Sequence, residues 1–526
     1  MLHARYPLLA LLGFALFGCG ASAAASSGAH TLAAEPLARE VHGEVSYEAR
    51  QPTLTGTSIA VERRPARRVT VWAVGEDGAS LAEAQADDAG HYSLLVPGRA
   101  VAVAALARID DGAIHLVVSP NPDGATPHRY SRPVAEIEGN VLDLPIGVDA
   151  PDGVAGAFHI LDTLLRGSRT AHDWTGRDLP PFFAYWGRGI THDWSYYHGE
   201  TPEGSGRFGI ELLGGNPDAW RTSDTDENDE AIVLHEFGHF VMDRLTTDSS
   251  SGGDHGGGAL IESGLAWEEG RASFFGVAVL GQPFYRDTLG LEPNGSTRVD
   301  DNFERRGMGP RGPGSEEGVA EVLWDLADGA GGLPDEDHDG VALGPATVLR
   351  AMIDLGAQPQ SFPAIDTFLR FLIDDGRVPL ADMKHMLVVG DQPMSMIPPA
   401  AETYPLVLAM DAPREGRIDS LSNPAPSGGP PRHSSGYDAV RTYRVHVPRD
   451  GRLYVYLEIQ GSGRGADHQD LDLELRDLRA SLLASAREEK PGESLAQDVQ
   501  AGDYIVQVRG GGGGNRADYR ISARLE

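Results

Sequence analysis

The residues best suited to chemistry lie in the short segment 234–239, which reads L-H-E-F-G-H. Two histidines four positions apart lie on one face of a helix, so both imidazoles can bind the same zinc ion. A glutamate beside the first histidine can face a water molecule near the metal and accept its proton. Water activated in this way attacks polarised carbonyl groups. The segment therefore predicts a metal site with His235 and His239 as ligands and Glu236 as the general base.

A third ligand must come from elsewhere, because catalytic zinc sites use three protein ligands and leave a fourth position for water. Metzincins place a glycine and a third histidine after H-E-x-x-H, but residues 240–243 read F-V-M-D here. The segment 265–275 instead resembles the E-G-x-A-x-F helix of gluzincins, the thermolysin-like superfamily. This resemblance implies Glu269 as the third zinc ligand, with Glu268 and Glu262 as the alternatives.

The wider stretch 226–275 looks like a group of bacterial secreted metalloproteases, but it departs from thermolysin at one position. Thermolysin has an aspartate four residues after the ligand glutamate, and this sequence has Ser273 there. A hydroxyl can orient the first histidine, though less strongly than a carboxylate. The group that would stabilise an oxyanion stays open among His255, His338, Tyr196 and Tyr197. The aromatic residues that would either line a cleft or pack in the core are Trp186, Trp194, Tyr196 and Tyr197.

The segment that carries the first two ligands has the pattern of a helix. The acidic residues 226–230 suit a helix N-terminus, where the helix dipole is positive. The apolar stripe that follows is formed by Ile232, Val233, Phe240 and Val241. Helical patterns continue through 151–411. Together with the gluzincin resemblance, they predict a mainly helical α+β zincin-like metallopeptidase domain over this range.

Residues 41–146 show the alternation of β-strands, as in V-T-V-W-A-V at 69–74. The turn and strand at 86–97 resemble a hairpin of transthyretin-like, carboxypeptidase-regulatory-like sandwiches, with Ala86 in place of the usual threonine. The resemblance implies that 41–146 form such a β-sandwich.

Residues 412–436 are rich in proline, glycine and serine, which is typical of a linker. Beyond them, strand alternation returns through 437–526. D-L-D-L at 470–473 and A-G-x-Y-x-V-x-V at 501–508 resemble the bacterial pre-peptidase C-terminal domain, a small sandwich appended to secreted proteases. The expected fold is therefore multidomain, with the central zincin-like domain flanked by two small β-sandwiches.

The chain begins with the pattern of an export signal. Arg5 precedes an apolar run at 8–17 that is too short to span a bilayer. The sequence L-F-G-C at 16–19 resembles the lipobox of bacterial lipoproteins, and this implies lipid attachment at Cys19. The anchor would follow a signal peptide within 1–25 and hold the protein in the cell envelope.

The residues around that cysteine refine the expected location. Gly20 resembles a signal for outer-membrane rather than inner-membrane sorting, and the Ala/Ser-rich residues 26–40 suit a tether. The alternative is ordinary signal-peptidase cleavage after A-S-A at 21–23, which would release a soluble secreted protein.

Composition restricts the chemistry and the partners. The single cysteine, Cys19, allows no intrachain disulfide and no thiolate metal cluster. The 526 residues carry a net charge of −33, which repels phosphate backbones and anionic lipid surfaces. Nucleic acid is therefore excluded as a partner, and the lipid anchor is the one expected contact with a membrane.

A second metal pattern occurs at 335–340, which reads D-E-D-H-D-G. Acidic residues at positions 1, 3 and 5 and glycine at 6 are those of a calcium loop, but position 12 is Ala346 instead of a bidentate glutamate. The segment is either a calcium site or a solvated acidic loop. Asp470 and Asp472 are calcium ligands only by resemblance to the C-terminal domain family.

Together, these features predict an exported, lipid-anchored zinc endopeptidase that cleaves a protein or peptide substrate. The alternative is a non-catalytic adhesion protein of the cell surface with a zinc-bearing central domain. The presence of Glu236 argues against that alternative, because a scaffold needs no general base. Zinc-dependent hydrolysis of a non-peptide bond is a third possibility. We expect the flanking sandwiches to be dispensable for cleavage of short peptides, because the ligands lie within 226–275.

Overall fold

The computed structural model of the protein describes residues 37–200, 205–253, 255–256, 258–305, 309–419, 436–460, 470–488, 492–510 and 516–526. The predicted export signal, Cys19 and residues 420–435 of the predicted linker lie outside the described residues. None of the helices within these ranges combines the length and apolar composition that crossing a bilayer requires.

The N-terminal unit contains two β-sheets in which most neighbouring strands are antiparallel. Strand β1 (Arg39–Ala49) pairs with three others, namely β12 (Leu144–Ile146), β4 (Glu62–Pro65) and β7 (His91–Val96). The second sheet has the order β11 (Arg129–Pro133), β8 (Ala102–Leu106), β5 (Thr70–Val74) and β6 (Ser80–Gln85). Alternate residues of β7 are buried, as the two-residue period of a strand requires. A short hairpin of β2 (Pro52–Thr53) and β3 (Gly56–Thr57) extends from this unit.

The central unit is built on a five-stranded sheet. Its order is β14 (Tyr196–Glu200), β15 (Phe208–Glu211), β13 (Phe182–Tyr185), β10 (His115–Ser119) and β9 (Arg108–Asp110). Strands β10, β13 and β15 run parallel to one another, whereas β14 is antiparallel to β15 and forms an edge. Residues 108–119 were assigned above to the N-terminal sandwich, but the structure pairs β10 with β13 in the central sheet. Strand alternation shows which faces are buried but does not identify the sheet that a strand joins.

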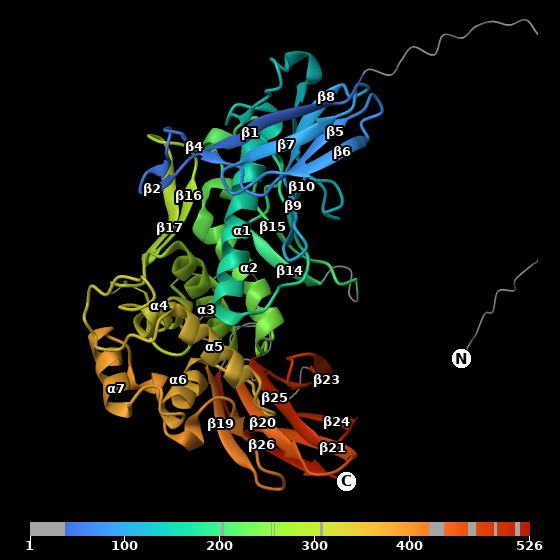
Figure 1. Ribbon diagram of the computed structural model, residues 1–526. Helices are drawn as coiled ribbons and strands as arrows, with labels where there is room; N and C mark the ends of the chain where they lie inside the picture. The colour runs from blue at the N-terminus through green and yellow to red at the C-terminus, as the bar shows by residue number, and fades with distance from the viewer. Residues whose placement is uncertain are drawn as a thin grey trace, which may run out of the picture.

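Seven helices belong to the central unit as described. They are α1 (Ala155–Thr175), α2 (Glu230–Leu245), α3 (Ser263–Leu280), α4 (Glu316–Ala327), α5 (Pro345–Gly356), α6 (Ile365–Asp374) and α7 (Leu380–Val389). A hairpin of β16 (Phe284–Leu289) and β17 (Ser296–Asn302) connects α3 to α4. Helix α1 runs along the molecule between the N-terminal strands and the other helices (Figure 1).

The C-terminal unit is a pair of β-sheets with a hydrophobic core of its own. One sheet has the order β18 (Leu406–Val407), β20 (Val440–Val447), β25 (Gly502–Gly510), β22 (Leu471–Arg476) and β23 (Leu482–Ala486). The other has the order β19 (Arg414–Asp419), β26 (Arg516–Leu525), β21 (Gly451–Gln460) and β24 (Glu493–Val499). Strands β18 and β19 come before residue 420, so the C-terminal unit begins earlier in the chain than the predicted boundary at 437.

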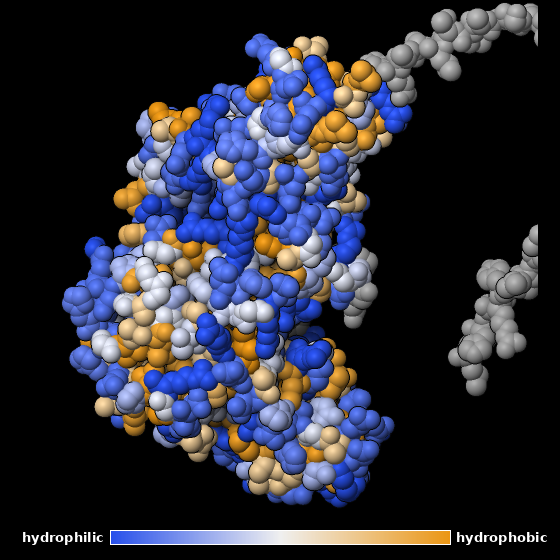
Figure 2. Space-filling model, in the orientation of Figure 1, coloured by the Kyte–Doolittle hydropathy of each residue, from blue (hydrophilic) through white to orange (hydrophobic). Residues whose placement is uncertain are grey.

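The chain is therefore a multidomain α+β protein. One hydrophobic core is continuous from the N-terminal strands into the central helices, and the C-terminal core is separate. On the face seen in Figure 2, hydrophobic side chains are scattered among hydrophilic ones, in keeping with the net charge of −33.

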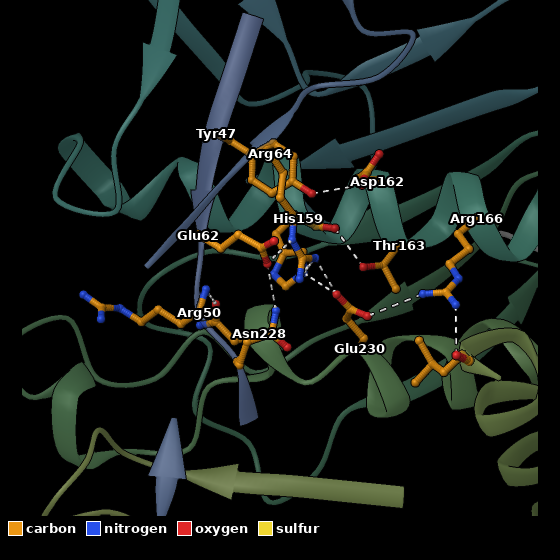
Figure 3. Close-up of polar contacts among 12 residues, drawn as sticks. Tyr47, Arg50, Glu62, Arg64, His159, Asp162, Thr163, Arg166, Asn228 and Glu230 are labelled. Atoms are coloured by element: carbon orange, nitrogen blue, oxygen red, sulfur yellow. Dashed lines mark hydrogen bonds and ion pairs between the residues drawn. The ribbon is translucent and has the colours of Figure 1, made fainter. Parts of the chain in front are cut away.

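Polar contacts also join the N-terminal strands to the first turn of α2. Arg64 on β4 donates from Nη1 to Glu230 Oε1 at 2.6 Å, and His159 Nε2 on α1 lies 2.9 Å from the same oxygen (Figure 3). Tyr47 on β1 donates its hydroxyl to Asp162 of α1 at 2.9 Å. Because Glu230 is the first residue of α2, the N-terminal unit helps to position the helix that carries His235.

Candidate metal centre

Helices α2 and α3 cross closely because glycines lie at their contact. A Cβ added at Gly238 would lie 2.9 Å from the carbonyl oxygen of Ala272. A Cβ at Gly276 would lie 3.2 Å from the carbonyl oxygen of Ala231. The absence of these side chains lets the two backbones approach, so ligands on both helices can reach one point.

We expect Gly238→Ala to destabilise the protein and loosen the metal centre. Overpacking of a helix contact costs about 1–3 kcal/mol, which exceeds the gain of up to about 1 kcal/mol from the helix propensity of alanine. The measurements are the denaturation midpoint and the zinc affinity. Gly187→Ala is the matched control, because a Cβ there meets nothing within 4 Å. Equal effects of the two substitutions would contradict the close-packing argument.

The two histidines and Glu269 converge on one point. His235 Nε2 and His239 Nε2 are 3.1 Å apart, and Glu269 Oε2 lies 3.4 Å and 3.2 Å from them. Tetrahedral zinc with ligand bonds near 2.0–2.1 Å separates its donor atoms by about 3.3 Å. Two imidazoles and one carboxylate are a donor set used by catalytic zinc sites. The three residues therefore fit a zinc ion in both spacing and chemistry.

The carboxylates at this point favour positive charge, whether a proton on His239 or a bound metal ion. Burial alone would raise the pKa of Glu269, but the imidazoles of His239 and His255 hold it well below its usual range. Burial lowers the pKa of His239, but Glu269 and Glu236 reverse this and raise it to about 9. The carboxylate of Glu269 is thus ionised, as a metal ligand must be.

Ser273 orients the first histidine. It lies one turn after Glu269 on α3, and its Oγ is 2.9 Å from His235 Nδ1. A hydrogen bond at Nδ1 leaves Nε2 free to face the metal position. The hydroxyl thus takes the place that the sequence comparison with thermolysin assigned to an aspartate.

The two alternative ligands face elsewhere. Glu268 contacts Arg271 and accepts a hydrogen bond from the Ser249 amide at 3.2 Å. Burial raises the pKa of Glu268 to about 8 despite the opposing effect of Arg271. Glu262 caps α3 by accepting from the amides of Gly264 and Leu265 at 2.8 Å and 3.1 Å. Only Glu269 of the three carboxylates lies with the histidines.

Two cavities adjoin the ligands. One has a volume of about 520 Å³ and the other of about 430 Å³, and Glu236 lines both. Glu236 is only 7% exposed, so its carboxylate lies in a confined space next to the ligands. Residues that line both cavities include Ser195, Tyr196, His235, His255 and Glu269. The metal position is therefore shared by the walls of both cavities.

The four residues considered for an oxyanion are placed differently. His255 Nε2 lies 3.5 Å from Glu269 Oε1, so His255 is at the centre. Tyr196 and Tyr197 lie on β14, but their hydroxyls donate to Glu211 and Asp243 at 2.9 Å and 2.6 Å. His338 lies in the loop at 335–340, next to Asp335.

The aromatic residues separate into core and cleft. Trp186 is fully buried in the core, whereas Trp194 is 57% exposed and lines the larger cavity. Arg298 lies over the Trp194 ring at 3.7 Å from its centroid. Tyr196 also lines that cavity, and Tyr197 stacks parallel to the His239 ring.

Tyr285 is a site residue that the sequence analysis missed. It lies on β16, lines the larger cavity, and its ring centroid is 5.7 Å from that of His235. Burial and then the charge of Glu236 raise the pKa of Tyr285 well above its usual range, so its hydroxyl keeps its proton. No motif surrounds Tyr285 in the sequence, because its place depends on the β16–β17 hairpin folding back onto α2.

The larger cavity has an acidic wall. The carboxylates that line it include Asp226, Asp287, Asp301, Glu316 and Glu317. Burial and the nearby Asp224 raise the pKa of Asp287 to about 7, and burial and Glu317 raise that of Asp301 to about 6. Arg298, which also lines this cavity, is paired with Asp224 at 2.5 Å. The wall therefore gains negative charge, and with it attraction for cations, as the pH rises through about 6 to 7.

Comparisons with known proteins add little to this geometry. No protein-family model matches the sequence, and no curated protein matches it. The pre-peptidase C-terminal domain of collagenase from Bacillus anthracis is similar in structure at 10% identity, covering 22% of this chain and 92% of that one, with a TM-score of 0.17. PliG, a periplasmic inhibitor of g-type lysozyme from Aeromonas hydrophila, is similar at 10% identity over 22% of this chain and 96% of that one, with a TM-score of 0.14. Both scores are too low to inform the metal centre.

Proposed function

We propose that this protein is a zinc-dependent endopeptidase of the gluzincin type. The observation that carries the proposal is the convergence of His235 Nε2, His239 Nε2 and Glu269 Oε2 at separations of 3.1–3.4 Å. Glu236 adjoins these ligands on α2 and lines the same cleft. A purely structural zinc site uses four protein ligands and needs neither an open position nor a neighbouring base.

Each residue then has a defined task. When bound by His235, His239 and Glu269, zinc would polarise the scissile carbonyl and lower the pKa of water. Glu236 accepts a proton from the attacking water and donates it to the leaving amine. Tyr285 and His255 face the same space and can donate hydrogen bonds to the oxygen that develops negative charge.

The substrate class follows from the walls of the cleft. Strand β14 is an edge of the central sheet among the described strands, and its Tyr196 lines both cavities. An edge strand can pair with an extended peptide through main-chain hydrogen bonds. The acidic wall around Asp287 and Asp301 favours peptides with lysine or arginine near the scissile bond.

The remaining parts of the proposal come from the sequence. A lipid anchor at Cys19 would hold the enzyme at the outer membrane, and cleavage after 21–23 would instead release it. The C-terminal sheets would be a domain of the pre-peptidase C-terminal kind. Either route would put the cleft outside the cytoplasm, where exported or environmental proteins would be the substrates.

The test is metal-dependent cleavage of a quenched-fluorescent peptide library by the full chain. We expect one zinc per chain, loss of cleavage on chelation, and recovery when zinc but not magnesium is added back. Products cut within the peptides, with a preference for basic side chains, would support the endopeptidase assignment. Zinc binding without any cleavage would favour the non-catalytic adhesion protein. Cleavage only of ester or other non-peptide substrates would move the reaction to a different bond.

A further inference from the structure

Acidic residues converge at a second place, far along the chain from the metal centre. The loop between α4 and α5 brings Asp337 and Asp339 to Asp325, near the end of α4, and one carboxylate oxygen of each lies within 4.8 Å of the others. An adjoining group with the same spacing consists of Glu304, Asp328, Asp335 and Asp337. Asp337 belongs to both groups, so the six carboxylates form one acidic cluster.

Two oxygens in this cluster are buried without a hydrogen-bond donor. Asp328 and Asp339 are each only 1% exposed. Asp328 Oδ1 and Asp339 Oδ2 form no hydrogen bond with any described residue. The other oxygen of Asp339 accepts from the Val341 amide at 2.7 Å, so the side chain is fixed with Oδ2 directed away from that amide. A buried carboxylate oxygen is costly when nothing binds it, and in native proteins it points to a ligand.

The described side chains supply little positive charge to this cluster. Asp325, Asp328, Asp337 and Asp339 form no ion pair with any arginine, lysine or histidine in the described ranges. The nearby Arg305 pairs instead with Glu336 at 3.1 Å, on the exposed side of the loop. His338 is 81% exposed and lies 3.2 Å from the outer member Asp335. Burial and the neighbouring carboxylates raise the pKa of Asp328 to about 9 and that of Asp339 to about 7, so these groups either hold protons or share a bound cation.

We propose that this cluster binds calcium and that the ion ties the 335–340 loop to the end of α4. Calcium takes six to eight oxygen ligands in flexible geometry, whereas zinc prefers nitrogen and sulfur, and magnesium demands a strict octahedron. A calcium loop normally has a bidentate glutamate at position 12, where this chain has Ala346. Asp325 and Asp328 supply the missing carboxylates from a different element.

The bound ion would also stabilise the position of α4, which packs against the helix that carries Glu269. Helix α4 packs against α3, where a Cβ at Gly270 would lie 2.5 Å from Val319. Gly270 follows Glu269, so movement of α4 reaches the helix that carries that carboxylate. Calcium is thus expected to stabilise the central unit, and this role does not depend on the proposed peptidase activity.

Terbium luminescence tests binding directly, because Tb³⁺ replaces Ca²⁺ and is excited through nearby tryptophan. Trp324 is placed for this, since its Nε1 donates to Glu304 Oε2 at 2.6 Å. We expect a sensitised Tb³⁺ signal in the full chain that excess Ca²⁺ displaces and Mg²⁺ does not. Asp339→Asn should weaken Tb³⁺ binding by about tenfold or more. Glu336→Gln is the matched control in the same loop and should bind as wild type.

Thermal unfolding keeps the test independent of any folding defect in the variant. Calcium at about a hundredfold above its Kd should raise the Tm of wild type and Glu336→Gln by about 5 °C or more. Calcium should change the Tm of Asp339→Asn little. In the presence of a chelator, this variant should have a Tm at least as high as that of wild type, because it carries one less buried charge. Identical Tb³⁺ signals and calcium shifts in wild type and Asp339→Asn would show a solvated acidic loop and overturn the proposal.

Discussion

Replacing Glu236 by glutamine is expected to slow peptide hydrolysis by about 10²–10⁴-fold while leaving zinc binding unchanged. Glutamine preserves the shape of the side chain and its capacity for hydrogen bonds, but it cannot accept a proton. Neighbouring residues of a helix are about 100° apart, so Glu236 can face the attacking water without sharing the ligand position of His235. The substitution should therefore remove proton transfer alone.

The measurement is kcat/KM on the best peptide of the library, with zinc content determined on the same samples. Glu236→Asp is the informative companion, because it keeps the carboxylate but withdraws it by one methylene. We expect its activity to lie between those of wild type and Glu236→Gln. If Glu236→Gln binds zinc normally and cleaves as fast as wild type, the proposed mechanism fails and the adhesion-protein alternative gains support.

The local part of the site could be predicted because its geometry lies within helices. His235, Glu236 and His239 take their relative positions from the helical repeat alone, and Ser273 lies one turn after Glu269 for the same reason. The helical repeat does not show which carboxylate joins the histidines, and the choice of Glu269 depended on the family resemblance. In the structure, the choice between Glu268 and Glu269 depends on the face of α3 that packs against α2.

The residues contributed by distant elements could not be predicted. Tyr285 and Asp287 reach the cleft only because the β16–β17 hairpin folds over α2, where Asp229 accepts from the Thr288 amide at 2.9 Å. The acidic loop shows the same limit. Its spacing could be read from the sequence, but Asp325 and Asp328 join it through the fold.

Domain boundaries were the least predictable feature. The segment 41–146 alternates like a sandwich throughout, yet β10 pairs in parallel with β13, with Leu116 opposite Phe182. Arg64 also holds Glu230 at the start of α2 (Figure 3). The segment 41–146 therefore contributes two strands, β9 and β10, and an ion pair to the central unit. The expectation that the N-terminal unit is dispensable for the cleavage of short peptides does not suit this architecture.

Glu269 and Glu268 offer a paired test of the metal centre, because they are adjacent, buried and chemically identical. Glu269→Gln is expected to lower zinc affinity by at least about 100-fold, beyond the effect of losing an outer hydrogen-bond partner. The reason is that its Oε2 occupies one corner of the donor triangle, at 3.4 Å and 3.2 Å from the two Nε2 atoms. Hydrolysis should fall with the metal.

Glu268→Gln should keep zinc, because its carboxylate contacts Arg271 and accepts from the Ser249 amide instead of meeting the histidines. Its effect should instead appear in the denaturation midpoint, since the buried Arg271 loses its carboxyl partner. Zinc content and unfolding, measured on both variants, thus give opposite patterns. If Glu268→Gln loses the metal and Glu269→Gln retains it, the ligand is displaced by one residue. The close crossing of α2 and α3 would then have to place a different face of α3 against the histidines.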